Sequence, residues 1–504
     1  MCMLVVACGA LVSLAAGALA LAAWLWATRP QTSIPGPPTL PLLGNATLFY
    51  KLPVLLDRLG ELHRRYGDIF RFYAGPKLII VVTQPDDVQK LMATRKPRER
   101  DPYFTYLLST FLGNGILVNK GEVWKNHRKV IEPAFHSEEL EKFMDMFNES
   151  GSFLCSKLDE SNGAETELSI LLTMSAVRSI SATIFDIKID LLIPGLRKQA
   201  EWAAQLADFA KTLSTILYRP WTTIPFFKWM TAEGRAIMRI RKAAEDLTCR
   251  GIALRRENIS NIDINGRSFL TYLHPEKNLW FTITEKEINE EVITLYGAGI
   301  ETTSDTTGYL LTLLGLHPEW QQMAQRELDD VFGNGGDYLR PVTTADLAQL
   351  TVLDAIIKEA LRLFSTVPCM PYLLTEDTPL AGGRYVAPRG STVLVAYYLL
   401  HRQPQLFPDP HKFDPSRFLE GGSATTRKPY SYVPFGVGPR KCVGARYAIM
   451  HIKTLLAVVL RRYCILPGSS RRDLEESVLS ITTHPITGFK VICIPRDNTA
   501  VGSV

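Results

Sequence analysis

The stretch Phe435-Gly436-Val437-Gly438-Pro439-Arg440-Lys441-Cys442-Val443-Gly444 sets one cysteine among glycines, directly before a helix-forming run at residues 445–462. Glycine permits tight backbone bends and a close approach to a flat ligand. At a helix start, the positive end of the helix dipole and the free amide groups favour a thiolate over a thiol. A stabilised thiolate is what a strongly donating iron ligand requires. The alternative is a structural cysteine buried in a turn.

The composition is that of a packed globular enzyme. The chain has 504 residues, of which 46% are apolar and 21% charged, so it allows one unusually large domain or two ordinary ones. A net charge of +5 is too small to indicate nucleic acid as a partner. The eight cysteines are scattered without CxxC pairs, which favours reduced thiols facing the cytosol over a disulfide framework or a zinc site.

An apolar segment at residues 3–27 contains no charged side chain. At about 1.5 Å per residue, a helix of this length crosses the ~30 Å hydrocarbon layer with some tilt. Trp24 and Trp26 suit a membrane interface, and Arg29 as the first flanking charge favours a cytoplasmic location for the rest of the chain. We therefore predict a membrane anchor at residues 1–28. The alternative is a cleaved signal peptide, but the segment lacks a basic start and is too long.

A proline-rich hinge is predicted at residues 29–40, because successive prolines fix φ and remove backbone donors. Two β-rich runs, at 69–73 and 78–82, are separated by a short Gly-Pro turn and predict a hairpin. Helical patterns dominate most of the rest, and no repeat or low-complexity linker divides residues 41–504. The predicted fold class is mainly α with a small β region, as one large domain behind an N-terminal transmembrane helix.

Five spaced positions of the cysteine stretch match FxxGxRxCxG, the haem-binding signature of the cytochrome P-450 superfamily. In a chain of this length, such a match arises by chance on the order of once in ten thousand. The resemblance covers nearly the whole chain and indicates the microsomal type. It implies the cytochrome P-450 fold and haem b (iron protoporphyrin IX), with Cys442 as the axial iron ligand and Phe435 and Gly436 against the haem.

A second motif, Ala298-Gly299-Ile300-Glu301-Thr302-Thr303, is similar to the superfamily's oxygen-activation motif. It lies in a helix that Thr284 and Glu287 are predicted to start with a capping box. Gly299 is expected to thin the helix where dioxygen sits. Glu301 and Thr302 are expected to relay protons there as the catalytic pair. Without the cysteine signature downstream, a glycine and two threonines in a helix would more often mark a place where a neighbouring element packs closely.

Glu359 and Arg362 lie three residues apart in a predicted helix, so they face the same way. By itself this spacing is common among surface ion pairs. Followed by Phe413-Asp414-Pro415-Ser416-Arg417-Phe418, it resembles the superfamily's ExxR and PxRF elements. The resemblance implies a buried structural network of Glu359, Arg362 and Arg417 that fixes the loop carrying the cysteine.

Trp124 and Arg128 resemble the WxxxR pattern of the superfamily helix that contacts the haem propionates. A guanidinium is a natural partner for a carboxylate. Arg440, inside the cysteine signature, is a second predicted propionate ligand. The alternative for the first pair is a basic, solvated helix, because further basic residues surround them: Lys120, Lys125, His127 and Lys129.

Within the superfamily, Pro133-Ala134-Phe135-His136, Leu374-Thr375-Glu376-Asp377-Thr378 and His401-Arg402 resemble family four, the fatty-acid ω-hydroxylase group. The chain departs from that family at two positions. Ala298 stands where many members have a glutamate that esterifies the haem, and Tyr372 stands where a propionate-binding arginine usually lies. The resemblance thus implies a haem contact for Ala298 without a covalent bond.

The resemblance further implies a monooxygenase that inserts one oxygen atom of O2 into a C–H bond of a lipophilic substrate. A fatty acid is the first expectation, with sterols, terpenoids and xenobiotics as alternatives. Electrons from NADPH would arrive through a flavoprotein reductase, with cytochrome b5 as a further partner, at the endoplasmic reticulum membrane with the catalytic domain facing the cytoplasm. Two other functions stay open: a peroxide isomerase or dehydratase of the same fold, and a non-enzymatic haem sensor.

Two surface features follow from residue type. Residues 221–230 (WTTIPFFKWM) are rich in aromatics, so they predict either core or a loop that dips into the bilayer. Lysines near the presumed proximal face predict a docking surface for an acidic reductase domain: Lys120, Lys125, Lys129 and Lys441.

Overall fold

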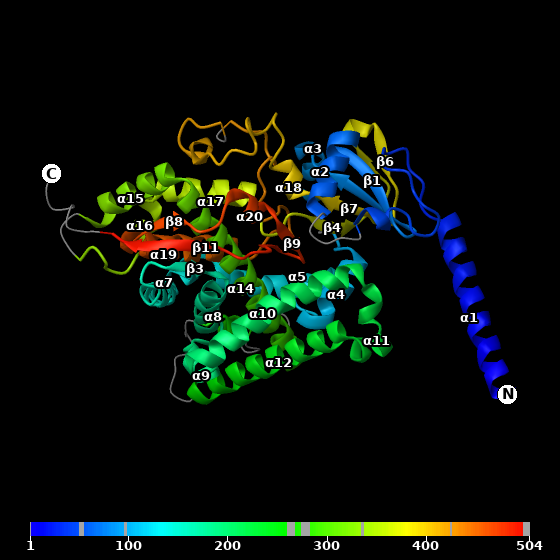
Figure 1. Cartoon of the computed structure of the whole chain (residues 1–504), viewed down its shortest axis with the longest axis horizontal. Helices are drawn as coiled ribbons and strands as arrows, with labels where there is room; N and C mark the ends of the chain where they lie inside the picture. The colour runs from blue at the N-terminus through cyan, green and yellow to red at the C-terminus, as the bar shows by residue number, and fades with distance from the viewer. Residues whose placement is uncertain are drawn as a thin grey trace.

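The computed structural model describes residues 2–49, 55–94, 98–259, 268–273, 283–333, 337–423 and 426–496. The predicted mainly helical class with a small β region is what the structure has (Figure 1). The described helices are α1 (Cys2–Ala27), α2 (Leu55–Tyr66), α3 (Pro85–Met92), α4 (Pro102–Leu112), α5 (Gly121–Ile131), α6 (Ser137–Glu141), α7 (Met144–Asp159), α8 (Ser169–Phe185), α9 (Ile189–Leu192), α10 (Leu196–Tyr218), α11 (Pro225–Met230), α12 (Ala232–Ile259), α13 (Phe269–Leu273), α14 (Glu285–Leu316), α15 (Pro318–Phe332), α16 (Thr344–Gln349), α17 (Thr351–Leu363), α18 (Tyr397–Leu400), α19 (Ala445–Arg462) and α20 (Arg471–Glu475). The described strands are β1 (Ile69–Ala74), β2 (Lys77–Val82), β3 (Glu165–Glu167), β4 (Met370–Leu373), β5 (Thr378–Leu380), β6 (Tyr385–Ala387), β7 (Thr392–Val395), β8 (Tyr463–Pro467), β9 (Ser477–Leu479), β10 (Thr483–Pro485) and β11 (Lys490–Pro495).

The predicted hairpin is formed by β1 and β2, whose register pairs Tyr73 with Leu78 and Ala74 with Lys77. Gly75 in the turn has φ +58°, a conformation that glycine adopts at little cost. The hairpin belongs to a four-stranded sheet of order β1-β2-β7-β4, in which β2 and β7 are parallel. In this sheet β7 lies between β4, which carries Tyr372, and β2, which precedes β7 by more than 300 residues of chain.

Helix α14 is the longest of the described helices and lies at the centre of the hydrophobic core. Its start is the predicted capping box: the Thr284 side chain accepts from the Glu287 amide at 3.2 Å, and the Glu287 carboxylate accepts from the Thr284 amide at 2.8 Å. Most of its side chains from Val292 onwards are buried, and they pack in one hydrophobic cluster with α7, α8, α17 and α19. This packing fixes the position of the motif at residues 298–303 inside the domain.

The N-terminal helix α1 extends away from the rest of the chain in Figure 1. Among the described residues, none of the helices combines the length and the hydropathy that a membrane span requires. The transmembrane anchor predicted over residues 3–27 is therefore not confirmed and stays a prediction.

The proline-rich stretch is non-helical, as predicted, and it is attached to β1. The Arg71 amide donates to the Pro35 carbonyl at 2.8 Å, and the Tyr73 hydroxyl donates to the Pro30 carbonyl at 2.7 Å. A Cβ on Gly36 would meet the Arg71 carbonyl at 2.1 Å, so only glycine allows this approach. The hinge and the domain boundaries stay predictions.

The aromatic stretch at 221–230 is not core. Its large apolar side chains are exposed: Trp221 by 50%, Ile224 by 47%, Phe226 by 60%, Phe227 by 39%, Trp229 by 65% and Met230 by 52%. Pro225 begins the short helix α11, which carries four of these side chains on two turns. An exposed apolar surface of this kind indicates an interaction with a membrane or a partner.

Candidate active site

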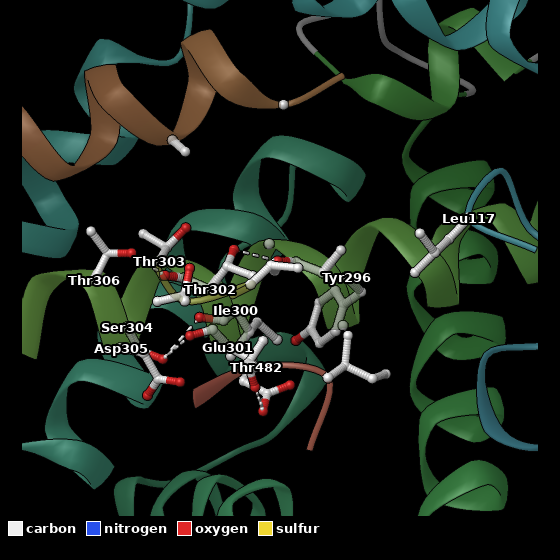
Figure 2. Close-up of a pocket in the computed structure, with 18 of the residues that line it drawn as sticks. Leu117, Tyr296, Ile300, Glu301, Thr302, Thr303, Ser304, Asp305, Thr306 and Thr482 are labelled. Carbon is white, nitrogen blue, oxygen red and sulfur yellow. Dashed lines mark hydrogen bonds between the residues drawn. The ribbon is translucent and has the colours of Figure 1, made fainter. Parts of the chain in front are cut away.

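A cavity of about 880 Å³ is lined both by α14 and by the loop that carries Cys442. It brings together predicted site residues from distant parts of the sequence: Trp124, Arg128, Ala298, Glu301, Thr302, Phe435, Gly436, Arg440 and Cys442. Figure 2 shows the α14 residues along this space. The three predicted network residues, Glu359, Arg362 and Arg417, do not line it.

The cysteine loop folds back on itself before α19 begins. The Cys442 amide donates to the Phe435 carbonyl at 2.9 Å, and the Gly436 amide donates to the Val433 carbonyl at 3.0 Å. Gly436 and Gly438 have φ of +69° and +77°, and a Cβ on Gly438 would meet the Met92 carbonyl at 2.1 Å. The glycines therefore permit the turn that presents Cys442 to the cavity.

Cys442 is exposed to the cavity, just ahead of the Ala445 start of α19. Its removal from bulk water raises the pKa of the Cys442 thiol, while the Gly444 amide and the cationic Arg128 lower it. The amide acts in the direction expected from the sequence, but loss of solvation is the larger effect. A cation bound at the sulfur would favour the thiolate.

The two predicted propionate ligands lie beside one another and already have protein partners. Arg128 Nη1 donates to the Lys441 carbonyl at 2.9 Å and Nη2 pairs with Glu132 at 3.1 Å. Arg440 lies 4.1 Å from the Trp124 ring centroid, and its Nη2 pairs with Glu99 at 2.9 Å. These bonds orient both guanidinium groups at one edge of the cavity.

A third arginine at the cavity was missed by the sequence analysis. Arg100 is only 7% exposed, yet its Nε and Nη1 have no hydrogen-bond partner among the residues that the structure describes. It lines the cavity together with Tyr372, whose ring centroid is 4.9 Å from the guanidinium. A buried cation without acceptors is costly unless an anion meets it. No motif contains Arg100, so only its contacts reveal the site.

The residues present fit a haem. Cys442 offers a thiolate on one wall, and cysteine thiolate is an established ligand for haem iron. Arg100 has unused donors and Arg440 Nε is likewise unpaired among the described residues, so guanidinium groups are available for carboxylates at one edge. The arrangement matches a flat ligand with a metal at its centre and acidic groups on its rim.

The predicted structural network is assembled away from the cavity. Glu359 and Arg362 are both 0% exposed and form a bidentate pair, with Nε–Oε2 at 2.7 Å and Nη2–Oε1 at 2.8 Å. Arg417 Nε lies 3.4 Å from Glu359 Oε1, and its Nη2 donates to the Asp409 carbonyl at 3.0 Å. All three side chains are therefore brought together, as the motif implies.

This network is linked to the cysteine loop through His401. Arg362 Nη1 donates to the His401 carbonyl at 2.8 Å, and His401 Nε2 accepts from the Val433 amide at 2.9 Å. Burial, followed by the charge of Arg362, lowers the pKa of His401 well below its ordinary value, so its ring stays neutral and can accept this bond. Val433 lies two residues before Phe435, at the entrance to the loop.

Glu301 and Thr302 have different partners. The Thr302 hydroxyl donates to the Ala298 carbonyl at 2.7 Å, whereas Glu301 Oε1 accepts from the Thr482 hydroxyl at 2.5 Å. Figure 2 shows Glu301 directed to Thr482, away from Thr302. Burial, with the charge of Asp305, raises the pKa of Glu301 to about 7. A direct proton transfer between the pair would require Glu301 to change partner.

Ala298 and Gly299 contribute backbone rather than functional side chains. Ala298 lines the cavity and offers no carboxylate, so its carbonyl is left to accept the Thr302 hydroxyl. A Cβ on Gly299 would lie 2.8 Å from Ile180 Cδ1, which shows that Gly299 allows α8 to pack closely against α14. Gly299 also lines the cavity, and the thinning of the helix at an oxygen site stays a prediction.

The chain is similar to proteins of one family along most of its length. The family model described as Cytochrome P450 matches residues 34–490. "Probable cytochrome P450 4aa1" of Drosophila melanogaster is 30% identical over 471 residues, covering 92% of this chain and 89% of that protein. "Cytochrome P450 4V2" of Rattus norvegicus is 33% identical over 430 residues, covering 81% and 79%, and its Homo sapiens counterpart is 30% identical over 426 residues.

With its cysteine-bearing cavity and this fold, the protein belongs to the class of haem-containing monooxygenases. The chain is a member of the cytochrome P450 family and resembles family four within it.

Proposed function

We propose that the protein inserts one oxygen atom of O2 into a C–H bond of a lipophilic substrate. The observation that carries this proposal is the cavity in which Cys442 and Thr302 meet a largely apolar wall. That wall is built from α4, α10, α12 and α14, and includes Phe111, Leu112, Leu213, Ile240 and Ile293. Apolar pockets of several hundred Å³ take drug-sized or lipid molecules. A fatty acid is the first expectation, and a sterol, terpenoid or xenobiotic would suit the same wall.

Cys442 would hold the haem iron, and Arg100, Arg128 and Arg440 would hold its propionates. When bound, the haem supplies the activation of O2 by its iron, which a thiolate ligand favours. The chain's own residues then exclude water through the apolar wall and hold a hydroxyl, Thr302, on the α14 side of the cavity. Thr302 donates to a backbone carbonyl, so its oxygen is free to accept a proton from solvent or from Glu301 and to pass on its own.

Electrons are proposed to come from NADPH through a flavoprotein reductase, with cytochrome b5 as a further donor. Lys441 is exposed one residue from Cys442 and would meet an acidic partner there. Lys125 is paired with Glu122 at 2.5 Å on the surface of α5, which reduces its own contribution. Docking that depends on such exposed charges would weaken as salt screens them.

We further propose attachment to the endoplasmic reticulum membrane, with residues 1–28 as anchor, 29–40 as hinge and 41–504 as the haem-binding domain on the cytoplasmic side. The exposed side chains of Trp221, Phe226 and Trp229 support a second contact with the lipid surface. A lipophilic substrate would then enter from the membrane. Removal of residues 1–28 should weaken sedimentation with lipid vesicles and leave haem binding unchanged.

The deciding experiment uses the purified full-length chain with reductase, NADPH and a lipid extract. Fractions that shift the Soret band identify ligands, and mass spectrometry of the same fractions should then reveal products heavier by one oxygen atom. NADPH oxidation without a reductase-dependent product, combined with rearrangement of lipid peroxides, would instead show an isomerase or dehydratase. Ligand-dependent spectra with neither reaction would indicate a haem sensor.

A further inference from the structure

The cavity has a polar part on the side of α14 where Glu301 lies. The residues that line it include Glu167, Ser169, Thr173, Glu301, Asp305 and His484. The same cavity is also lined by Ile170 and Ile486, which are 37% and 51% exposed, so this part reaches the surface. It is therefore a route between solvent and α14 that is distinct from the apolar wall.

Two hydrogen-bonded pairs join α14 to the segment around β10. Asp305 Oδ1 accepts from His484 Nδ1 at 2.8 Å, and Glu301 Oε1 accepts from Thr482 at 2.5 Å. Asp305 follows Glu301 by one helical turn, so the two carboxylates face the same way. Asp305 is 5% exposed, and its Oδ2 has no hydrogen-bond partner within the described part of the chain. A buried carboxylate oxygen that lines a cavity without a partner is placed to accept a proton from water.

The charges around this pair differ in sign. Burial raises the pKa of Asp305 and is opposed by His484. Burial disfavours the imidazolium of His484, but Asp305, with smaller effects of Glu301 and Glu167, raises its pKa overall. Tyr309, the other titratable group beside Asp305, is buried with a pKa raised above its ordinary value. His484, Asp305 and Glu301 are thus three groups that can exchange protons, His484 beside β10 and the two carboxylates on α14.

We propose that His484 and Asp305 form a proton inlet that supplies Glu301 from solvent during turnover. The inference rests on the proposed monooxygenase function. Conversion of RH, O2, two electrons and two protons into ROH and water consumes protons that the cavity must import. His484 takes a proton from solvent and gives one to Asp305, and Asp305 passes it to Glu301 through water in the cavity. Glu301 then turns from Thr482 to Thr302 and gives the proton to the Thr302 hydroxyl, which passes its own proton on to be consumed in the reaction. Two such transfers supply the two protons of one turnover, and each residue ends the cycle with the protons it began with.

Two experiments test the inlet, and the second separates it from a merely structural role in which these bonds hold β10 on α14. The first experiment follows the Glu301 carboxyl stretch by infrared spectroscopy in the resting full-length protein, with Glu301→Gln to assign the band. Because the Asp305 charge raises the pKa of Glu301 and His484 lowers it, Asp305→Asn should shift the titration to lower pH and His484→Gln to higher pH. Glu290→Gln removes another buried carboxylate of α14 and should shift nothing. Absence of both shifts would overturn the inlet.

The second experiment measures proton supply in the same proteins with reductase and NADPH. Asp305→Asn and His484→Gln should slow reductase-supported turnover on the order of tenfold, less than the ~10²–10⁴-fold of a positioned acid because water can bypass the inlet. Both should enlarge the rate difference between H2O and D2O, and Asp305→Glu should restore the rate. Turnover and isotope effect equal to wild type would overturn the proposal. If the monooxygenase function itself fails, wild type and all variants lack NADPH-dependent turnover, whereas failure of the inlet alone leaves the variants with the turnover of wild type.

Discussion

Arg100 and Tyr372 pair with each other across two separate segments of the chain. Their backbones form an isolated antiparallel bridge, and the Arg100 guanidinium lies 4.9 Å from the centroid of the Tyr372 ring. The neighbouring Leu373 amide donates to the Glu99 carbonyl at 3.0 Å, so β4 fixes the backbone of Arg100 as well. The resemblance to family four leads one to expect an arginine at position 372, where this chain has a tyrosine. Arg100, on a different segment, supplies a cation to the same cavity instead.

Arg100→Ala should weaken haem retention because a buried cation with unused donors at the cavity edge is lost. We expect haem to transfer to apomyoglobin faster by about tenfold, since one charged hydrogen bond contributes roughly 1.5–3 kcal/mol. Arg98→Ala serves as the control, because Arg98 donates to the Leu91 carbonyl and is absent from the cavity wall. Adding Tyr372→Arg to Arg100→Ala should recover retention. A double variant no better than Arg100→Ala would refute exchange between the two positions.

Cys442→Ser should abolish the red-shifted absorption of the reduced carbonyl complex, because a hydroxyl does not replace a thiolate as the iron ligand. The carbonyl spectrum of the reduced protein measures this directly. Cys464→Ser, in β8, should keep the wild-type band. A Cys442→Ser protein that retained the band would assign the ligand to another residue.

Thr302→Ala should separate NADPH oxidation from product formation. Its hydroxyl lines the cavity, and without it protons reach the oxygen site in a less controlled way, so hydrogen peroxide should replace product. NADPH, peroxide and product are measured together in the reconstituted system. Thr307→Ala is the matched control, because Thr307 makes the same bond to a carbonyl one turn back, Thr303 at 2.8 Å, but does not line the cavity. Equal coupling in both variants would remove Thr302 from proton delivery.

Asp346→Asn should destabilise the fold in a pH-dependent way. Arg340 hydrogen-bonds the carboxylate at 2.7 and 2.8 Å and holds the pKa of Asp346 at about 2, below the ordinary 3.8. A lowered pKa stabilises the folded state above pH ~4, and this contribution is lost as the pH falls towards ~2. We expect a loss of about 1–2 kcal/mol near pH 7, allowing for the partial exposure of Arg340. Unfolding midpoints of both proteins should converge on acidification, and a constant difference would contradict the assignment.

Acidic organic solvent should extract all the haem with unmodified mass. An ester to the ring needs a carboxylate at the position of Ala298, and alanine has none. The next acid along, Glu301, is bonded to Thr482 and directed away from Thr302. The measurement is the mass of the extracted haem and the absorbance left on the denatured chain. Haem retained by that chain would identify a carboxylate elsewhere in the cavity as its attachment point.

Local patterns predicted the local structure well. The two β-rich runs and the Gly-Pro turn between them predicted β1 and β2, and the Thr284 capping box starts α14 as expected. Neighbouring residues also distinguished Cys442 from the seven other cysteines, because glycines surround it and a helix-forming run begins shortly after it. These features depend on neighbours within a few residues, which a single sequence contains.

Contacts between distant segments could not be predicted in this way. Asp305 and His484 are 179 residues apart, and Arg100 and Tyr372 are 272 apart, so no spacing reveals either pair. The direction of the Glu301 side chain depends likewise on Thr482 of the C-terminal region. The aromatic stretch at 221–230 was ambiguous because hydropathy does not distinguish a buried side chain from one that faces a lipid surface.

The link from Glu359 and Arg362 through His401 to Val433 has a consequence for the order of assembly. All of its bonds join protein groups, so the position of Val433 at the entrance of the cysteine loop does not depend on a bound metal. Haem capture then becomes the docking of a rigid ligand into a preorganised receptor, with little conformational entropy left to lose. A newly synthesised chain can therefore order the start of this loop first and bind haem afterwards. The free energy of haem binding is then not needed to order that part of the loop.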